Sequence, residues 1–155
     1  MRAPILLCTD GSDLAVEALS AGLALLGRDH QLVLATVSDG PDPGALVGSG
    51  HAGAELTPKE YDRRVAAAHG SARAAIDTAR SELGLADAEA RVLQGDPGEA
   101  ICRLASELSA GAIVIGSRGR GGLKRAFLGS VSDHVVRNAP CSVIVTGARA
   151  APPPG

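Results

Sequence analysis

The sequence alternates short apolar runs with longer segments of helical pattern, and this alternation strongly limits how the chain can fold. Alternating strands and helices are typical of a parallel sheet with helices on both faces. Most of the apolar runs are rich in β-branched residues, as expected of strands buried on both sides. Strands are predicted at Ile5–Thr9, Gln31–Val37, Ala88–Gln94, Ala112–Gly116 and Ser142–Thr146, and helices at Leu14–Leu26, Pro58–Leu83, Pro97–Ser109 and Ser130–Asn138. We therefore expect an α/β fold built on an open, five-stranded parallel sheet.

Capping and turn signals set the ends of the predicted helices. Two of the helices begin with a capping residue, a proline at the first helical position and a glutamate that completes the pattern of a capping box. The segment Ser38–Leu56 carries glycine, proline and aspartate without periodicity, and it is predicted to be a long loop. The expected caps are Thr57-Pro58-Lys59-Glu60, Asp96-Pro97-Gly98-Glu99, Ser12 or Asp13, and the stretch Ser130–Asp133 for the last helix.

Composition narrows the class of protein. The 155 residues fit one domain, and hydrophobic residues make up 45% of them, enough for a sizeable core. The formal net charge is −2, whereas general binders of nucleic acid or anionic membranes are usually basic, so we expect neither partner. No stretch approaches the roughly 20 apolar residues that a membrane span needs.

Cysteine usage and the two ends of the chain bear on its location. The apolar run Ile5–Cys8 is too short for a signal peptide. Three separated cysteines without a C-x-x-C pair are typical of reduced intracellular thiols. We therefore expect a cytoplasmic protein with one domain over residues 1–147 and a disordered, Ala/Pro/Gly-rich tail at 148–155.

The loop Gly116–Ser130 has three features that favour phosphate binding. Its glycines let the backbone approach an anion and turn N–H groups toward it. Gly129-Ser130 begins a predicted helix, where N–H groups and the helix dipole favour negative charge. The alternative is a flexible connector in which Ser130 is only a helix cap, but the position after a strand and before a helix favours phosphate. The loop has no acidic residue and four basic ones: Arg118, Arg120, Lys124 and Arg125.

Several segments resemble the universal stress protein family. The spacing Gly116-x-x-Gly119-x9-Gly129-Ser130 matches the G-2x-G-9x-G-(S/T) motif of its ATP-binding members. The resemblance covers about residues 3–146, and it implies a Rossmann-like, adenine nucleotide alpha hydrolase-like fold with strand order 3-2-1-4-5. It also implies ATP with Mg²⁺ as the ligand. The other matching segments are Asp10-Gly11-Ser12, Gly95-Asp96-Pro97, Gly129-Ser130-Val131-Ser132 and Asn138-Ala139-Pro140-Cys141-Ser142-Val143.

The same resemblance implies roles for residues at the carboxyl ends of the strands. Asp10 would contact ribose or adenine, since a carboxylate accepts from ribose hydroxyls, or it would only begin a turn or cap a helix. Val37 and Ile115 would form aliphatic walls beside the adenine, or belong simply to the core. Ser132 would add a second hydroxyl, or lie exposed in the first helical turn. The phosphate motif maps onto Gly116, Gly119, Gly129, Ser130 and Val131.

The implied function is that of a nucleotide-dependent stress-response module, with at most slow ATP hydrolysis. No Ser/His/Asp or Cys/His constellation marks a catalytic site, and the histidines at 30, 51, 69 and 134 lack metal-ligand spacing. One alternative is an ATP-consuming enzyme of similar fold, such as an adenylyl transferase, but the motifs of such enzymes are replaced here by Asp10-Gly11-Ser12-Asp13. A member that works through protein contacts without ATP is disfavoured by the intact glycine motif. A flavodoxin-like carrier is disfavoured by the scarcity of aromatic residues.

The last predicted strand indicates that two copies of the chain associate. Ser142–Thr146 is expected at a sheet edge and contains no Lys, Glu or Pro to protect it from pairing with another chain. The same strand of a second copy, antiparallel across a two-fold axis, would cover it. Similar family members dimerise in this way, so we expect a homodimer with Val143 and Val145 near the axis.

Overall fold

The strands form one parallel sheet in the predicted order. In the computed structural model, which describes residues 2–48, 55–117 and 128–147, the order is β3-β2-β1-β4-β5. The central strand β1 pairs with both β2 and β4, so that Leu7 lies opposite Leu34 on one side and Val114 on the other. The direction of strand addition reverses between β1 and β4, which is where ligands bind in sheets of this kind. The bounds are β1 Ile5–Cys8, β2 Leu32–Val37, β3 Glu89–Leu93, β4 Ala112–Gly116 and β5 Ser142–Thr146.

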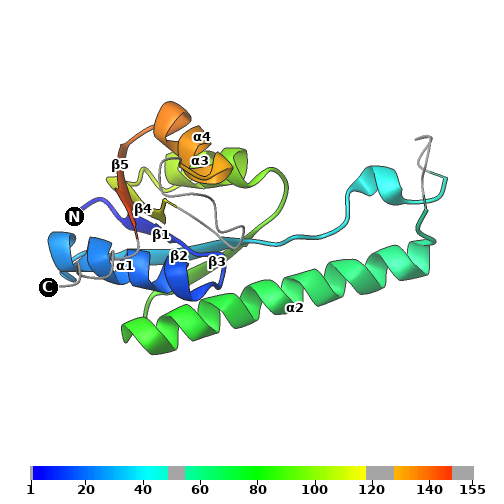
Figure 1. Cartoon of the computed structure of the whole chain (residues 1–155), viewed down its shortest axis with the longest axis horizontal. Helices are drawn as coiled ribbons and strands as arrows, with labels where there is room; N and C mark the ends of the chain where they lie inside the picture. Colours follow the sequence, from blue (N-terminus) through cyan, green and yellow to red (C-terminus); the bar gives the residue numbers. More distant parts are fainter. Residues whose placement is uncertain (1, 49–54, 118–127, 148–155) are drawn as a thin grey trace, which may run out of the picture.

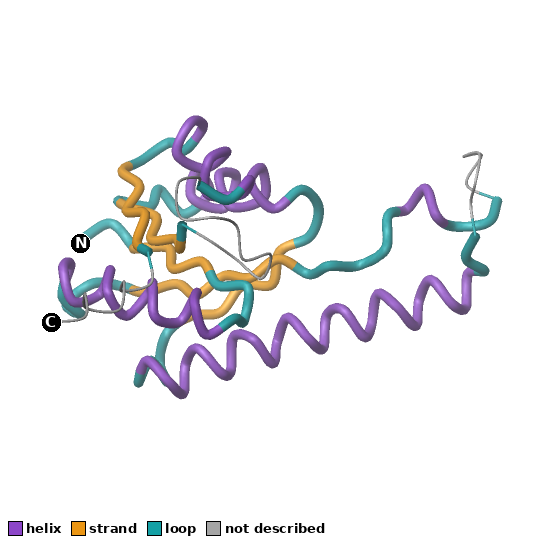
Figure 2. The backbone as a smooth tube through the Cα atoms, viewed as in Figure 1, coloured by secondary structure: helices purple, strands orange, loops and turns teal. Residues whose placement is uncertain are grey.

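Two helices cover each face of the sheet (Figure 1). On one face lie α1 (Asp13–Leu26) and α2 (Pro58–Leu83), and on the other lie α3 (Pro97–Glu107) and α4 (Ser130–Asn138). The backbone tube shows the sheet as the middle of three layers (Figure 2). The predicted α/β fold is therefore confirmed.

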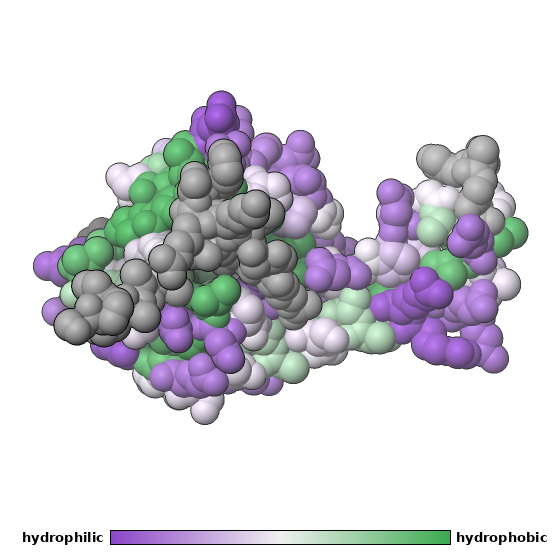
Figure 3. All heavy atoms as spheres, viewed as in Figure 1, coloured by the Kyte–Doolittle hydropathy of each residue, from purple (hydrophilic) through white to green (hydrophobic). Residues whose placement is uncertain are grey.

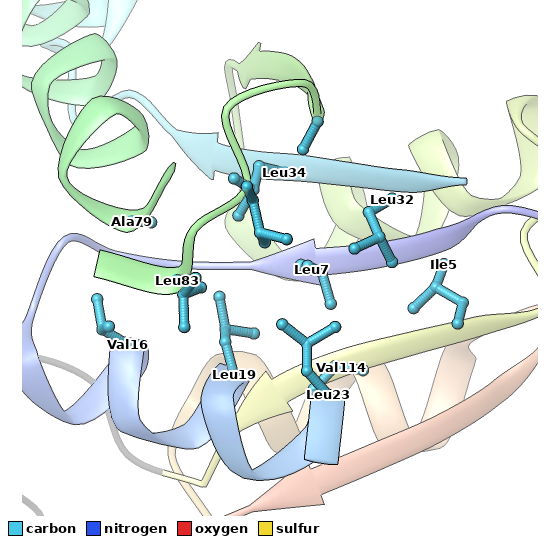
Figure 4. Close-up of a cluster of buried hydrophobic side chains, with 12 residues drawn as sticks. Ile5, Leu7, Val16, Leu19, Leu23, Leu32, Leu34, Ala79, Leu83 and Val114 are labelled. Atoms are coloured by element: carbon cyan, nitrogen blue, oxygen red, sulfur yellow. The ribbon is translucent and has the colours of Figure 1, made fainter. Parts of the chain in front are cut away.

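The two faces of the sheet carry separate aliphatic cores. Successive strand residues point to opposite faces, so Leu7 and Leu34 join the α1–α2 core, whereas Leu6 and Val33 join the α3–α4 core. Figure 4 shows Val16, Leu19 and Leu23 of α1 packed against the strands of the first core. Among the described residues, neither core contains an aromatic side chain, as the composition predicts.

Most of the predicted helix caps form. Thr57 and Glu60 make both hydrogen bonds of a capping box at the start of α2, and the Asp96 side chain accepts from the Glu99 N–H at the start of α3. Ser12, not Asp13, caps α1 by accepting from the Ala15 N–H. The prediction for α4 is wrong, because its N-cap is Gly129 and no side chain caps it.

The segment between β2 and α2 is more ordered than the sequence predicts. It contains a 3-10 helix, η1 (Pro43–Ala45), whose first turn is capped by Asp42. Leu46 then forms a bridge with Leu56, whose side chain is buried. Residues 49–54, which include His51, lie outside the described residues.

The first half of α2 extends beyond the carboxyl edge of the sheet (Figure 1). Its buried residues begin only at Ala72, and the turns before it contribute none. Hydrophilic residues cover most of this projecting end (Figure 3). The helix therefore forms an overhang beside the ends of the strands.

The edge strand β5 lies where the sequence predicts it. Among the described strands it pairs with β4 alone, and its residues from Val143 to Thr146 are half-buried. Among the helices of the described residues, none is long and apolar enough to cross a membrane.

Candidate functional site

A cavity of about 750 Å³ opens at the carboxyl ends of β1, β2 and β4. This is the reversal point of the strand order, and the cavity lies within the size range of small-molecule sites. Eight of the nine predicted site residues line it: Asp10, Val37, Ile115, Gly116, Gly129, Ser130, Val131 and Ser132. Gly119 lies outside the described residues, as do Arg118, Arg120, Lys124 and Arg125.

Asp10 forms a tight turn between β1 and α1. Its Oδ1 accepts from the Ser12 N–H at 2.9 Å and from the Ser12 hydroxyl at 2.5 Å. Gly11 between them has φ +82°, a conformation that favours glycine. Asp10 thus holds the turn, while Ser12 caps the helix. The carboxylate also lines the cavity, so the turn role and a ligand role are compatible.

Val37 presents its backbone to the cavity. The Ser38 N–H donates to Leu93 O of β3, and the Thr9 N–H donates to Ala35 O of β2. Backbone groups of successive strand residues point to alternate neighbours, so those of Val37 point toward β1, as those of Ala35 do. Because β1 ends at Cys8, the Val37 amide and carbonyl face the space beyond its end.

Gly116 has the same arrangement on the other side of β1. The Ser117 N–H donates to Thr146 O of β5 at 2.8 Å, so the backbone groups of Gly116 point the other way, toward β1. Ile115, only 7% exposed, belongs to the α3–α4 core and also lines the cavity. Ile115 is thus a core residue that also borders the cavity, and its place beside an adenine stays a prediction.

The uncapped amino terminus of α4 forms the far wall. Gly129 is the N-cap, and its own N–H donates to Ser117 O at 2.8 Å. Ser130 and Val131 occupy the first two helical positions, whose N–H groups have no partner within a helix. With the helix dipole, these two amides make a positive end that faces the cavity.

Ser132 is buried, not exposed as one alternative held. Its side chain is 2% exposed, and its hydroxyl lies 3.0 Å from Gly129 O and 3.4 Å from Ser117 O. Its hydroxyl hydrogen is therefore used inside the protein.

The structure adds lining residues that the sequence analysis missed. The overhanging part of α2 contributes Arg64, Ala67, Ala68 and Ser71, and Asp39 follows the end of β2. The run of small residues in α2 was a signal, but only the placement of the helix on the sheet shows which turn faces the cavity. Asp39 lies two residues beyond Val37 and adds a second carboxylate to the lining of the cavity.

The described part of the chain offers neither a metal-binding cluster nor an activated thiol at the cavity. No group of three or more His, Cys, Asp or Glu side chains there is placed to hold a metal ion. Cys8 lines the cavity, but burial raises the pKa of its thiol to about 12. A thiol with so high a pKa is a poor nucleophile at neutral pH.

Known proteins match both the sequence and the fold. The model of the Universal stress protein family matches residues 1–147. A universal stress protein of Thermus aquaticus is 35% identical over 141 residues, which are 91% of this chain and 96% of that protein. A solved universal stress protein from Lactobacillus plantarum has a TM-score of 0.69 at 25% identity, covering 94% of this chain and 99% of that one. Another, solved in complex with cAMP, has a TM-score of 0.60 at 26% identity, covering 94% and 97%.

The fold and the cavity make this a doubly wound α/β protein with a small-molecule pocket where the strand order of the parallel sheet reverses. The family match over nearly the whole chain then identifies it more closely. The chain belongs to the universal stress protein family.

Proposed function

We propose that this protein binds ATP with Mg²⁺ in the cavity and acts as a nucleotide-dependent stress-response module, with at most slow ATP hydrolysis. The observation that carries the proposal is the cavity itself, whose lining combines an uncapped helix terminus, aliphatic side chains and two carboxylates. The relative solved with cAMP supports an adenine nucleotide as the ligand class.

The phosphates would bind at the amino terminus of α4. The N–H groups of Ser130 and Val131 are the available donors, and the exposed Ser130 hydroxyl adds a third. Gly129 would contribute close approach and not a donor, because its N–H is bonded to Ser117 O. Gly119 is proposed to approach the phosphates as well, on the motif alone. Mg²⁺ would arrive with the nucleotide, bound mainly by phosphate oxygens and water.

The base would lie at the other end of the cavity, beyond β1. There the Val37 backbone offers one N–H donor and one C=O acceptor side by side. Adenine has an acceptor at N1 beside a donor at N6, which complements that pair. Guanine has the reverse pattern at the same two positions, so it would leave both backbone groups unsatisfied. Asp10 would accept from the ribose hydroxyls.

Two further parts of the proposal concern assembly and location. The half-buried edge strand β5 would pair with its copy in a homodimer, with Val143 and Val145 near the two-fold axis. A cytoplasmic location agrees with three free cysteines in a reducing compartment.

Calorimetry with a series of ligands tests the ligand assignment. We expect MgATP to bind more tightly than MgGTP, because of the base edge, and more tightly than adenosine, because of the phosphate cradle. Absence of heat, together with absence of competition at millimolar ATP, would refute nucleotide binding while leaving the fold untouched.

A further inference from the structure

A small cluster of hydrogen bonds closes the two ends of the glycine loop against each other. The Gly129 N–H donates to Ser117 O at 2.8 Å, and the Ser132 hydroxyl bridges Gly129 O at 3.0 Å and Ser117 O at 3.4 Å. We call these groups of Ser117, Gly129 and Ser132 the loop clasp. It stands where β4 ends and α4 begins, directly beside the proposed phosphate cradle.

The clasp is buried and tied to the sheet. Ser132 is the least exposed of the three buried polar side chains of the described residues, at 2%. On the other side, the Ser117 N–H donates to Thr146 O, which fixes Ser117 to the end of β5. The clasp therefore joins the first turn of α4 to a rigid strand.

The hydroxyl of Ser132 has a single hydrogen to donate. Two carbonyl oxygens of the clasp lie within its reach, so that hydrogen is used inside the clasp. Donation to a phosphate would require the clasp bond to break. This separates Ser132 from Ser130, whose side chain is exposed and caps nothing.

The bonds of the clasp decide which backbone groups an anion meets. Gly129 O accepts from the Asp133 N–H and from Ser132, and Ser117 O accepts from Gly129 and Ser132. Both partially negative oxygens are thus held toward α4. What faces the cavity from this turn is the positive end of the helix, the amides of Ser130 and Val131.

We propose that Ser132 is a positioning residue for phosphate recognition: its buried hydroxyl holds the carbonyls of Gly129 and Ser117 in place, so that the first amides of α4 point at the anion. The role in recognition rests on the proposed nucleotide function, whereas the clasp consists of contacts within the chain and can be measured without nucleotide. The experiment measures the two separately.

The test compares Ser132→Ala with Ser132→Thr, which restores a hydroxyl, and with Ser20→Ala on the exposed face of α1 as the matched control. In the nucleotide-free protein, amide hydrogen exchange of Gly129 should speed at least fivefold in Ser132→Ala, while that of Val135 in the same helix stays unchanged. Affinity for MgATP should fall fivefold to tenfold, with adenosine affinity unchanged within twofold. Ser132→Thr should recover both values in part, and Ser20→Ala should match the wild type.

Each arm has a contradicting result. If the exchange rate of the Gly129 amide is unchanged in Ser132→Ala, the clasp is overturned, whatever the affinity for ATP. A side chain that only contacted the ligand would not change exchange rates measured without nucleotide. Equal losses of ATP and adenosine affinity would overturn the specific role in phosphate recognition. A wild-type protein that binds ATP no better than adenosine would overturn the proposed phosphate cradle, and the exchange data would still decide the clasp.

Discussion

Replacing Ser130 by proline isolates one backbone donor of the proposed phosphate cradle. Ser130 is the first residue of α4, and the N–H at that position has no partner within the helix. Proline is favoured there, because its missing N–H costs the helix nothing. The preceding Gly129 has φ −61° and ψ +158°, the extended conformation that a residue before proline prefers. The chain already uses this arrangement, with proline at the start of both α2 and α3.

The matched control is Ser130→Ala, which removes the hydroxyl and keeps the N–H. A hydrogen bond to a charged group contributes about 1.5–3 kcal/mol. At about 1.4 kcal/mol per tenfold in affinity, Ser130→Pro should bind MgATP about tenfold to hundredfold more weakly than Ser130→Ala. Adenosine affinity should be the same in both variants, because adenosine carries no phosphate.

The Ser130→Pro variant should lose affinity for MgATP without losing stability. The side chain of Ser130 is exposed and makes no cap bond, and proline at a compatible position stabilises proteins by about 0.4–1 kcal/mol through the unfolded state. Calorimetry measures the affinities for ATP and for adenosine, and thermal melts measure the stability of each variant. Equal ATP affinity in the proline and alanine variants, with melting temperatures intact, would show that this amide does not meet the phosphates.

Three further predictions concern packing, assembly and pH. A Cβ at Gly22 would collide with Cγ1 of Val114, so Gly22→Ala should destabilise the protein by about 1–2 kcal/mol. A Cβ at Gly70 would meet nothing within 4 Å, so Gly70→Ala should stabilise the protein by up to about 1 kcal/mol; equal shifts of the two variants in denaturant midpoint would contradict the packing argument. The carbonyl oxygen of Thr146 faces β4, and backbone groups alternate along a strand, so the N–H of Val143 points away from the sheet and proline can replace this residue without breaking a bond to β4. In sedimentation, Val143→Pro should therefore be a folded monomer where the wild type is a dimer; a wild-type monomer, or a folded variant that stays dimeric, would refute the assembly. Burial raises the pKa of the Cys8 thiol from 9.0 to about 12, so the thiol ionises at lower pH in the unfolded chain than in the folded protein. The free energy of unfolding should therefore fall as pH rises from 9 toward 12 and show no such loss below pH 9; a flat profile in the wild type, or the same fall in Cys8→Ala, would contradict this assignment.

Much of the fold follows from local patterns in the sequence. The apolar runs form the strands of the sheet, and the Thr57 capping box begins α2 where the sequence predicts it. These signals act over a few residues, so neighbours in sequence are enough to interpret them. The start of α4 is the exception. Ser130 has the right chemistry for a cap, but the clasp holds Gly129 at that position instead.

The cavity was predictable only in part. Residues at strand ends, such as Asp10, Val37 and Gly116, could be placed because carboxyl ends of parallel strands meet at one edge. Arg64 and Ser71 could not, because their position depends on how far α2 overhangs the sheet. The same limit applies to Ser132. Its burial, and the use of its hydroxyl within the protein, come from contacts with Ser117, fifteen residues away in sequence.

Backbone amide NMR of the labelled protein, titrated with MgATP, tests the central claim most directly. We predict that the amide signals of Val37, Ser130 and Val131 shift together along one binding curve, because base and phosphate engage opposite ends of the same cavity. The amide signals of Ser142 and Val143 should stay in place, because the amino end of β5 pairs with the amino end of β4, whereas the cavity lies at the carboxyl end. Saturating MgATP that moves none of these three signals, or moves only residues outside the cavity, would contradict the account.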